Sequence, residues 1–464
     1  MPTFAPPEAV AEVIAALAAM LGNRLVTSLA VRQQHAHTLT WIANQPPDAV
    51  VYPHNTGEVA QIVRLCAENR VPMIPFGTGT SLEGHVNAPY GGVCIDTSLM
   101  KAVVAVHAED LDCVVEPGVT RKELNAHLRD RGLFFPIDPG ADASLGGMVS
   151  TRASGTNAVR YGTMKDNVIA LEVVTPDGEI VSTGQRARKS SAGYDLTRLF
   201  VGAEGTLGVV TRITLKLHGI PEAIAAGVCP FPSVRAACDA AIATIQCGLP
   251  VARIELLDAL QVKACNQYSK LSLPETAMLF SEFHGTQAGV AEQSTRFGEI
   301  AEEFGGGPFD WATLAEARSK LWQARHDVYW ATLTLRPGAQ VVSTDVCVPI
   351  SRLADCVEAT QDDIAASGLI SPIVGHVGDG NFHLGLLLDV ESPEEMKAAK
   401  SFLDRLAARA LAMEGTCTGE HGIGQGKIAY MAREHSPAAL AVMAGIKRGI
   451  DPHGVMNPGK VLAG

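Results

Sequence analysis

The sequence lacks three features that would each assign it to a common class of protein. None of its ten cysteines belongs to a Cys-x-x-Cys pair, so neither a zinc ribbon nor a dithiol redox centre is expected. The longest apolar stretch near the N-terminus, Val13 to Leu21, is far too short to cross a bilayer. Basic residues are outnumbered, with 37 Lys and Arg against 49 Asp and Glu and a formal net charge of −12, which argues against a nucleic-acid-binding protein.

The cysteines and the N-terminal sequence also indicate the cellular compartment of the protein. The cysteines are irregularly spaced and lie mostly within apolar runs, as buried and reduced thiols do. No basic segment precedes Val13, and no small-residue cleavage site follows Leu21. We therefore expect a cytoplasmic protein that is at most peripheral to a membrane.

The 464 residues suffice for two or three domains. Hydrophobic residues make up 47% and charged residues 19%, as in ordinary globular proteins. Glycine is in excess, at 45 residues or about one in ten, against an average of about 7%. Such an excess indicates tight turns or places where backbone approaches a ligand closely.

Helical and strand-like periodicities alternate along the chain and predict an α+β protein. Residues 1–45 form an N-terminal helical segment, and a first domain covers 46–220. After Pro221 the predicted helices become longer, and one of them spans 311–335. Residues 221–464 are therefore expected to form a second domain, with a C-terminal segment. In the first domain, Thr56 is expected to cap a helix that ends at Asn69.

Three segments of the first domain are rich in glycine and small polar residues. Pro75-Phe-Gly-Thr-Gly-Thr-Ser-Leu-Glu-Gly84 matches neither nucleotide-binding fingerprint. Its glycines can still present consecutive N–H groups to a diphosphate, although a plain turn explains it equally well. The longer run 138–162 and the segment Gly202 to Gly208 bring the total to three, which favours a large, extended ligand laid along backbone.

The second domain holds a cluster of histidines and carboxylates. Asp379-Gly380 between two apolar runs predicts a hairpin with His376 and His383 on its two strands. Glu420 and His421 follow in a glycine-rich segment. Two histidines and a carboxylate are a usual ligand set for a divalent metal, whereas the alternative is a pair of hydrogen-bonded loops.

A cation, Arg325, lies in an aromatic-rich helical stretch with Tyr329 and Trp330. An arginine there either is solvated or clamps a carboxylate through two parallel hydrogen bonds. The residues by themselves leave both interpretations open.

The loop 75–84, Asp138-Pro-Gly-Ala141, Ala153-Ser-Gly-Thr-Asn-Ala158 and Leu199 to Gly208 resemble the FAD-binding domain of the vanillyl-alcohol oxidase type. The resemblance implies that such a domain is followed by an α+β substrate or cap domain whose C-terminal segment returns to the flavin. His85 lies outside the position used for covalent attachment, so FAD is expected to bind non-covalently. The implied FAD-binding residues are Pro75, Gly77, Thr78, Gly79, Thr80, Ser81, Gly84, Pro139, Gly140, Ala141, Ser144, Gly146, Gly147, Ala153, Ser154, Gly155, Asn157, Gly208, Val209, Val210 and Asn457.

Over nearly the whole chain the sequence is similar to the FAD-linked D-2-hydroxy-acid dehydrogenases. Ala252-Arg-Ile-Glu255, Ala324-Arg-His326 and Ser343 to Ile350 most resemble the D-lactate dehydrogenase (cytochrome) branch. The resemblance implies oxidation of D-lactate to pyruvate. It assigns a divalent metal, zinc or manganese, to His376, His383 and Glu420, and the catalytic base to His421, which also contacts substrate. It further assigns the substrate to Arg325 and Tyr329.

In the implied mechanism the metal lowers the pKa of the substrate hydroxyl, His421 takes its proton, and hydride passes from C2 to the flavin N5. The hydroxyglutarate branch has a lysine where this chain has Ser343, which disfavours a dicarboxylate substrate. Glycolate, D-2-hydroxyglutarate and larger D-2-hydroxy acids stay as alternatives.

Two other classes remain. A metal-dependent hydrolase would use the same histidines and glutamate, and a catalytically silent flavin-binding subunit would use only the FAD-like loops. The expected partners are a small 2-hydroxy acid and an electron acceptor such as a cytochrome, a quinone or an electron-transfer protein. Homodimer formation is left open.

Overall fold

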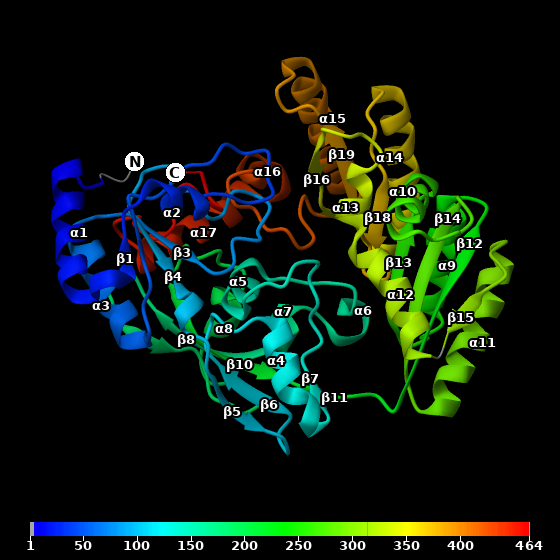
Figure 1. The fold of residues 1–464 in the computed structure, drawn as a ribbon, viewed down its shortest axis with the longest axis horizontal. Helices are drawn as coiled ribbons and strands as arrows, with labels where there is room; N and C mark the ends of the chain where they lie inside the picture. The colour runs from blue at the N-terminus through cyan, green and yellow to red at the C-terminus, as the bar shows by residue number, and fades with distance from the viewer. Residues whose placement is uncertain (1–3, 313, 464) are drawn as a thin grey trace. The chain divides into compact units, whose positions relative to one another are not determined.

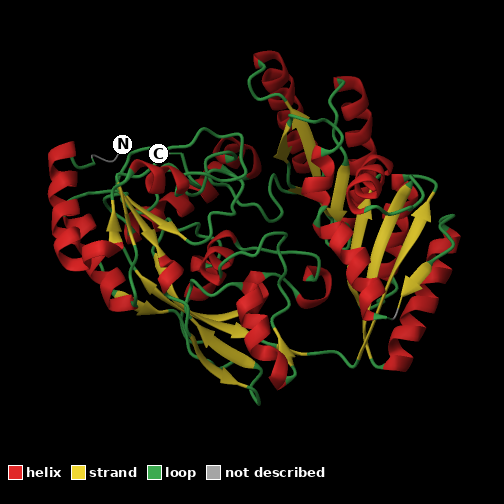
Figure 2. Ribbon diagram, in the orientation of Figure 1, coloured by secondary structure: helices red, strands yellow, loops and turns green. Residues whose placement is uncertain are grey.

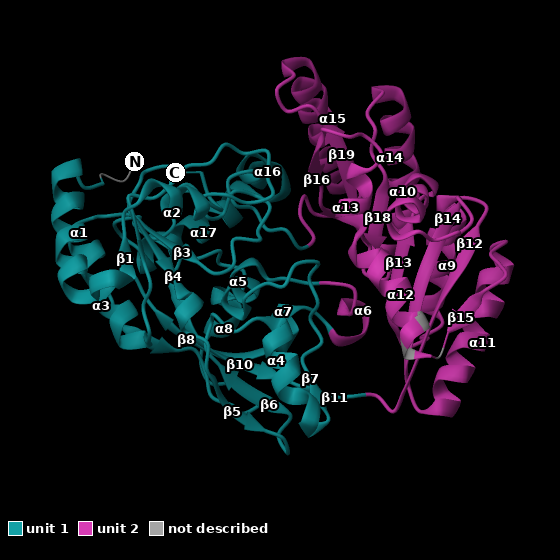
Figure 3. Ribbon diagram, viewed as in Figure 1, with its two compact units in different colours: residues 1–154, 162–220, 420–464 teal, residues 155–161, 221–419 magenta. Residues whose placement is uncertain are grey.

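The computed structural model describes residues 4–312 and 314–463, and Figure 1 follows the chain through them. The chain divides into two compact units (Figure 3). Unit 1 comprises 1–154, 162–220 and 420–464, and unit 2 comprises 155–161 and 221–419. Both units mix helices and sheets, which confirms the predicted α+β class (Figure 2).

Unit 1 contains two main sheets. In the first, β2, β4 and β3 run parallel, β1 pairs antiparallel with β2, and the order is β1 (Leu25–Val26), β2 (Ala49–Val51), β4 (Val93–Asp96), β3 (Met73–Phe76). The second is antiparallel, in the order β5 (Val103–His107), β6 (Asp112–Val115), β10 (Val209–Lys216), β8 (Val168–Val174), β9 (Ile180–Ser182). β7 (Leu133–Phe134) and β11 (His218–Gly219) form a separate ribbon.

Helices and short 3₁₀ turns connect these strands. The helices of unit 1 are α1 (Pro7–Leu21), α2 (Leu29–Gln34), α3 (Thr56–Glu68), α4 (Arg121–Leu128), α5 (Leu145–Thr151), α7 (Met164–Asn167), α8 (Leu196–Phe200), α16 (Ile428–Glu434) and α17 (Pro437–Ile450). The 3₁₀ turns of the two units span Gly22–Arg24, Thr97–Leu99, Arg129–Arg131 and Ile350–Arg352.

The start of α3 differs from the prediction. Asn55, not Thr56, is the N-cap, because its extended backbone lets its side-chain oxygen accept from the N–H of Glu58 at 3.0 Å. The Thr56 hydroxyl instead donates to Glu172 Oε1 at 2.7 Å.

The segment 420–464 belongs to unit 1. It lies inside the bounds 221–464 expected for the second domain, whose C-terminal segment is expected to return to the flavin. Its backbone lengthens the ladder of β3, since the N–H of Met73 donates to Val455 O and the N–H of Asn457 donates to Met73 O, both at 2.8 Å. These two bonds at a sheet edge explain why the segment leaves the domain that precedes it in sequence.

Unit 2 is built on one eight-stranded sheet. Its strands, in order, are β15 (Asp310–Ala312), β12 (Ala223–Phe231), β14 (Ala277–Gly285), β13 (Val251–Leu257), β18 (Ile373–His376), β19 (Asn381–Leu388) and β16 (Gln340–Ser343), with β17 (Val346–Cys347) also paired to β19. Its helices are α6 (Ala158–Tyr161), α9 (Val234–Gln246), α10 (Ala259–Ser269), α11 (Gln287–Glu303), α12 (Ala315–His326), α13 (Val328–Leu333), α14 (Leu353–Ser367) and α15 (Pro393–Ala412).

The helix expected over 311–335 is broken into β15, α12 and α13. The break falls at Asp327, whose backbone leaves the helical region. Its carboxylate accepts from the Gln323 side chain at 2.9 Å. Aspartate is unfavourable inside a helix because its short side chain bonds locally.

The two faces of the unit 2 sheet differ. One face is apolar and packs against α9, α11, α14 and α15, with Leu279, Phe283, Phe382 and Leu384 among its buried residues. The other face packs a smaller apolar cluster against α10, α12 and α13. Because strand side chains alternate, the charged residues within β13 and β14 project from this second face.

The predicted hairpin forms between β18 and β19. Val374 pairs with His383 and His376 with Asn381, so both histidines lie on the second face. Gly380 closes the turn with φ +80°, and its carbonyl accepts from the N–H of Val348 at 3.0 Å. The strands therefore present the two histidines side by side.

Replacement of Gly380 by alanine should destabilise unit 2. The backbone has a positive φ, and an added Cβ would collide with the backbone of Val348. Strain and overpacking together should cost about 2–4 kcal/mol. Gly368 is the matched control, because it has φ +70° but open space around a Cβ, and its alanine variant should lose only about 1 kcal/mol. Thermal unfolding of both variants measures this, and equal losses would contradict the account.

Candidate active site

The FAD-like loop follows β3 directly. Gly77 lies so close to Ser144 that any Cβ there would collide with the Ser144 hydroxyl. The N–H of Ser144 donates to the Thr78 hydroxyl at 3.3 Å, and Ser144 itself caps α5 by accepting from the N–H of Gly147. Two of the predicted cofactor segments, 75–81 and 144–147, are thus in contact within unit 1.

This loop has the polar groups that a diphosphate needs. Among the residues that the structure describes, the backbone N–H groups of Thr78 through Ser81 donate to no protein acceptor. The hydroxyl of Ser81 is buried and likewise makes no hydrogen bond within the described chain. Gly79 has φ +65°, and a Cβ there would press on Phe76. A loop of donors with little side chain suits the phosphates of FAD.

Other predicted cofactor residues join this loop. Gly205 packs on Pro75, and Gly208 packs against the backbone of β8. The amide of Asn457 donates to Glu204 O at 2.7 Å and to His85 O at 3.2 Å, which places the C-terminal segment beside the same motif.

The remaining predicted FAD-binding residues are divided between the two units. Gly155 and Asn157 belong to unit 2, where the side chain of Asn157 accepts from Arg253 at 3.0 Å. Gly140 has nothing near its Cβ position. Part of the run 138–162, expected to be irregular, is helix α5, because Ser144 provides an N-cap.

A buried carboxylate, Glu204, holds the chain just after His421. Its two oxygens accept from the N–H groups of Ile423 and Gly424, each at 2.7 Å, and His85 Nε2 lies 3.0 Å from Oε2. Burial alone would raise the pKa of Glu204, but His85 and the two N–H groups hold it below its ordinary value.

The predicted metal ligands come together. His376, His383 and Glu420 each offer one ligand atom, and these atoms lie within 4.8 Å of one another. Glu420 is bonded directly to Gly419, the last residue of unit 2, whose own backbone packs against the Asn381 side chain. The separation is short enough for one divalent ion to be shared.

The hydrogen bond at Nδ1 of each histidine leaves Nε2 available to bind a metal. His376 Nδ1 lies 2.7 Å from Glu255 Oε1, and His383 Nδ1 lies 3.0 Å from the carbonyl oxygen of Thr344. Both partners are acceptors, so both Nδ1 atoms donate, and in the neutral imidazole Nε2 carries the lone pair. That tautomer is the one in which Nε2 can bind a metal, and the donor set therefore fits the predicted site.

Arg325 is buried and reaches the same carboxylate. Its Nε and Nη2 donate to Glu255 Oε2 at 2.9 and 2.5 Å. The arginine is thus not solvated, and within the described chain these are its hydrogen bonds, so its Nη1 edge is left for a further acceptor. Burial would raise the pKa of Glu255, but His376 and Arg325 hold it below its ordinary value.

The sequence patterns predicted no role for Glu255, although it lies in the motif Ala252-Arg-Ile-Glu255. A detectable signal was present, because Arg253 and Glu255 are two charges spaced by two within an apolar strand. Glu282 and His284 repeat the pattern on β14 and are bonded to each other at 2.8 Å. Charged alternation in a buried strand indicates a polar sheet face.

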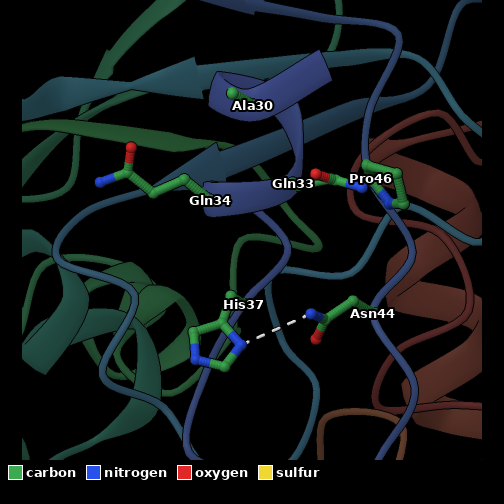
Figure 4. Close-up of a pocket in the computed structure, with 6 residues that line it drawn as sticks. All are labelled: Ala30, Gln33, Gln34, His37, Asn44 and Pro46. Carbon is green, nitrogen blue, oxygen red and sulfur yellow. Dashed lines mark hydrogen bonds between the residues drawn. The ribbon is translucent and has the colours of Figure 1, made fainter.

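A hollow in unit 1 of about 460 Å³ contains none of the predicted site residues (Figure 4). It is lined by Ala30, Gln33, Gln34, His37, Asn44 and Pro46. His37 and Asn44 are hydrogen-bonded to each other at 3.4 Å. No cluster of catalytic groups faces this hollow among the residues described.

Comparison with known structures shows the fold. Over 99% of this chain and 98% of the neighbour, a p-cresol methylhydroxylase superposes with a TM-score of 0.81 at 17% identity. A 4-ethylphenol oxidase from Gulosibacter chungangensis gives 0.79 at 18% identity over the same shares. Together with a matching FAD-binding domain at residues 47–184, they confirm the predicted fold of the vanillyl-alcohol oxidase type.

Related sequences give the family. The probable mitochondrial D-lactate dehydrogenase of Danio rerio is 52% identical, covering 98% of this chain and 92% of that protein. The mitochondrial D-lactate dehydrogenase [cytochrome] of Arabidopsis thaliana is 47% identical, covering 97% of this chain and 80% of that protein. The resemblance stated from the motifs is confirmed.

The expected cytoplasmic location is contradicted by these relatives. Both are named as mitochondrial proteins, as are two yeast relatives. A short apolar N-terminal stretch excludes a bilayer span but does not identify a compartment. In the described chain, no helix combines the length and apolar character needed to cross a membrane.

The C-terminal domain of FAD linked oxidases matches residues 220–461. With the FAD-binding domain before it, this match covers both units. The chain belongs to the family of FAD-linked oxidoreductases in which an FAD-binding domain precedes an FAD-linked oxidase C-terminal domain.

Proposed function

We propose that this protein oxidises D-lactate to pyruvate with non-covalently bound FAD and passes the electrons to a cytochrome-type acceptor. The observation that carries the proposal is that Arg325 and His376 share Glu255 on one sheet face of unit 2, with His383 beside His376 on the same face. The names of the relatives support the substrate and the acceptor.

Each proposed residue has one task. Arg325 binds the carboxylate of the substrate through its Nη1 edge. Tyr329, a half-buried residue in the first turn of α13, contacts the substrate. Burial raises the pKa of Tyr329, so its hydroxyl stays protonated and can donate. His421 accepts the proton of the C2 hydroxyl.

We further propose that His376, His383 and Glu420 hold a zinc or manganese ion. When bound, the metal supplies Lewis acidity at the C2 hydroxyl, and FAD accepts the two electrons. The histidine tautomers set by Glu255 and Thr344 support this ligand set.

The alternatives explain less of the molecule. A metal-dependent hydrolase leaves the FAD-binding domain without a role, and a silent flavin subunit leaves Arg325 buried for no purpose. Glycolate has some support, since a glycolate oxidase subunit of Bacillus subtilis is 33% identical. D-lactate is favoured because the relatives of higher identity act on it by name.

D-lactate should reduce the bound flavin and L-lactate should not. The proposed site fixes the substrate at three points: Arg325, His421 and the flavin. Only one enantiomer can then direct its C2 hydrogen at the flavin, and misplacement of the reacting atom lowers the rate about 100-fold or more. Anaerobic mixing with each enantiomer, followed by the visible flavin absorbance, measures this. Equal rates of bleaching would reject the site.

Ser343 should set the preference for a small substrate. It lies on the same sheet face as His383 and pairs with Gly385. D-2-hydroxyglutarate should be a poor substrate, and Ser343→Lys should raise its kcat/KM about 10- to 100-fold through one charge-assisted pair. Ser343→Gln is the control for length without charge. An equal gain with glutamine would contradict the electrostatic account.

His376→Ala should remove the metal and leave the flavin. One ligand of three is lost, while the FAD-like loops lie in unit 1. Metal analysis and the flavin spectrum of the purified variant measure the two separately.

Two control variants complete this test. His284→Ala removes a buried histidine that also pairs with a glutamate, and its metal content should stay normal. His421→Ala should keep both metal and flavin but lose turnover. Normal metal content in His376→Ala would refute the ligand assignment.

A further inference from the structure

One buried carboxylate contacts both halves of the proposed substrate site. Glu255 on β13 is only 1% exposed. Its Oε2 accepts from Nε and Nη2 of Arg325, and its Oε1 accepts from Nδ1 of His376 at 2.7 Å. Both oxygens are therefore occupied, each by a different functional side chain.

The strand register explains this bridge. β13 and β18 pair antiparallel, with Leu256 opposite Gly375 and Leu257 opposite Val374. Continuing that register by one residue sets Glu255 opposite His376. Cross-strand neighbours on one sheet face lie close enough for direct side-chain contact. The position of the carboxylate is thus dictated by backbone pairing.

The carboxylate does two things at once. As a pure acceptor it requires a proton on His376 Nδ1, which directs the lone pair of Nε2 away from β13. By taking two N–H groups from one edge of the guanidinium, it also sets the plane of Arg325.

We infer that Glu255 is a positioning residue that holds a metal ligand and the substrate-binding arginine in register with each other. This inference rests on the proposed metal site and the proposed role of Arg325. It adds that metal affinity and substrate affinity both depend on one side chain that touches neither ligand.

Glu255→Gln is the sharpest test, because it keeps shape and removes one acceptor. If the glutamine oxygen faces Arg325, its NH₂ group faces His376 Nδ1. The histidine must then protonate Nε2, and that nitrogen can no longer bind a metal. If the amide is reversed, two donors meet at Arg325. While His376 Nε2 binds a metal, no orientation of the amide satisfies both partners.

The chain contains a matched control. Glu282 on the neighbouring strand β14 also bonds a histidine, His284 at 2.8 Å, and also pairs with an arginine, Arg253 at 3.5 Å. It is 5% exposed and lies on the same sheet face. Glu282→Gln therefore makes the same chemical change in the same kind of surroundings, away from the proposed metal ligands.

The experiment measures Zn²⁺ affinity of the FAD-loaded protein by competition with a chromophoric chelator. Glu255→Gln should weaken binding about 10- to 100-fold, and Glu282→Gln should leave it unchanged. With Zn²⁺ saturating, Glu255→Gln should also raise the KM for D-lactate about tenfold or more, because Arg325 is no longer oriented.

Glu255→Asp is the second variant, and it tests the positioning role of Glu255 if Glu255→Gln does not fold. It keeps the charge but is one methylene too short to reach both partners, so its Zn²⁺ affinity should be intermediate. Wild-type affinity in a folded Glu255 variant, or equal weakening in Glu282→Gln, would overturn the inference. Absence of Zn²⁺ binding by the wild type would instead refute the proposed metal site, and the inference with it.

Discussion

The return of the C-terminal segment to unit 1 depends on the buried carboxylate of Glu204. A chain that re-enters a domain as an irregular loop brings backbone N–H groups that must find acceptors, since an unpaired buried N–H costs about 1–3 kcal/mol. Glu204 accepts from both Ile423 and Gly424. Gly422 has φ +80°, and a Cβ there would collide with the same carboxylate. The loop after Glu420 and His421 can therefore follow only this path.

Charge is concentrated on one face of the unit 2 sheet. Two sets of buried groups lie there, each with a glutamate between an arginine and a histidine, centred on Glu255 and Glu282. Buried ion pairs rarely add stability compared with apolar residues of similar size, because desolvation offsets the attraction. Stability of the sheet comes instead from its apolar face, against α9, α11, α14 and α15. The charged face is left to position functional groups.

Local signals in the sequence predicted many features correctly. Asp379-Gly380 identified the hairpin that brings His376 and His383 together, because turn residues between apolar runs act over a few residues. The glycines at 77 and 79 marked a close approach, which proved to be the N-cap of α5 and the ring of Phe76. Predictions were wrong where two neighbouring side chains could fill the same role. At the start of α3, Asn55 and Thr56 could each cap the helix, and Asn55 does so.

The sequence by itself determined the α+β class, the glycine-rich loops, the hairpin, and the residue types at the candidate site. Each depends on spacing within a short stretch of chain. Only the tertiary structure decided that Arg325 and His376 share Glu255, and that the segment that joins unit 1 begins at residue 420. Those pairings unite residues 70 and 121 positions from Glu255. Which distant strands become neighbours is settled by burial of apolar faces and by pairing of backbone groups across the whole unit, and no local pattern contains that information.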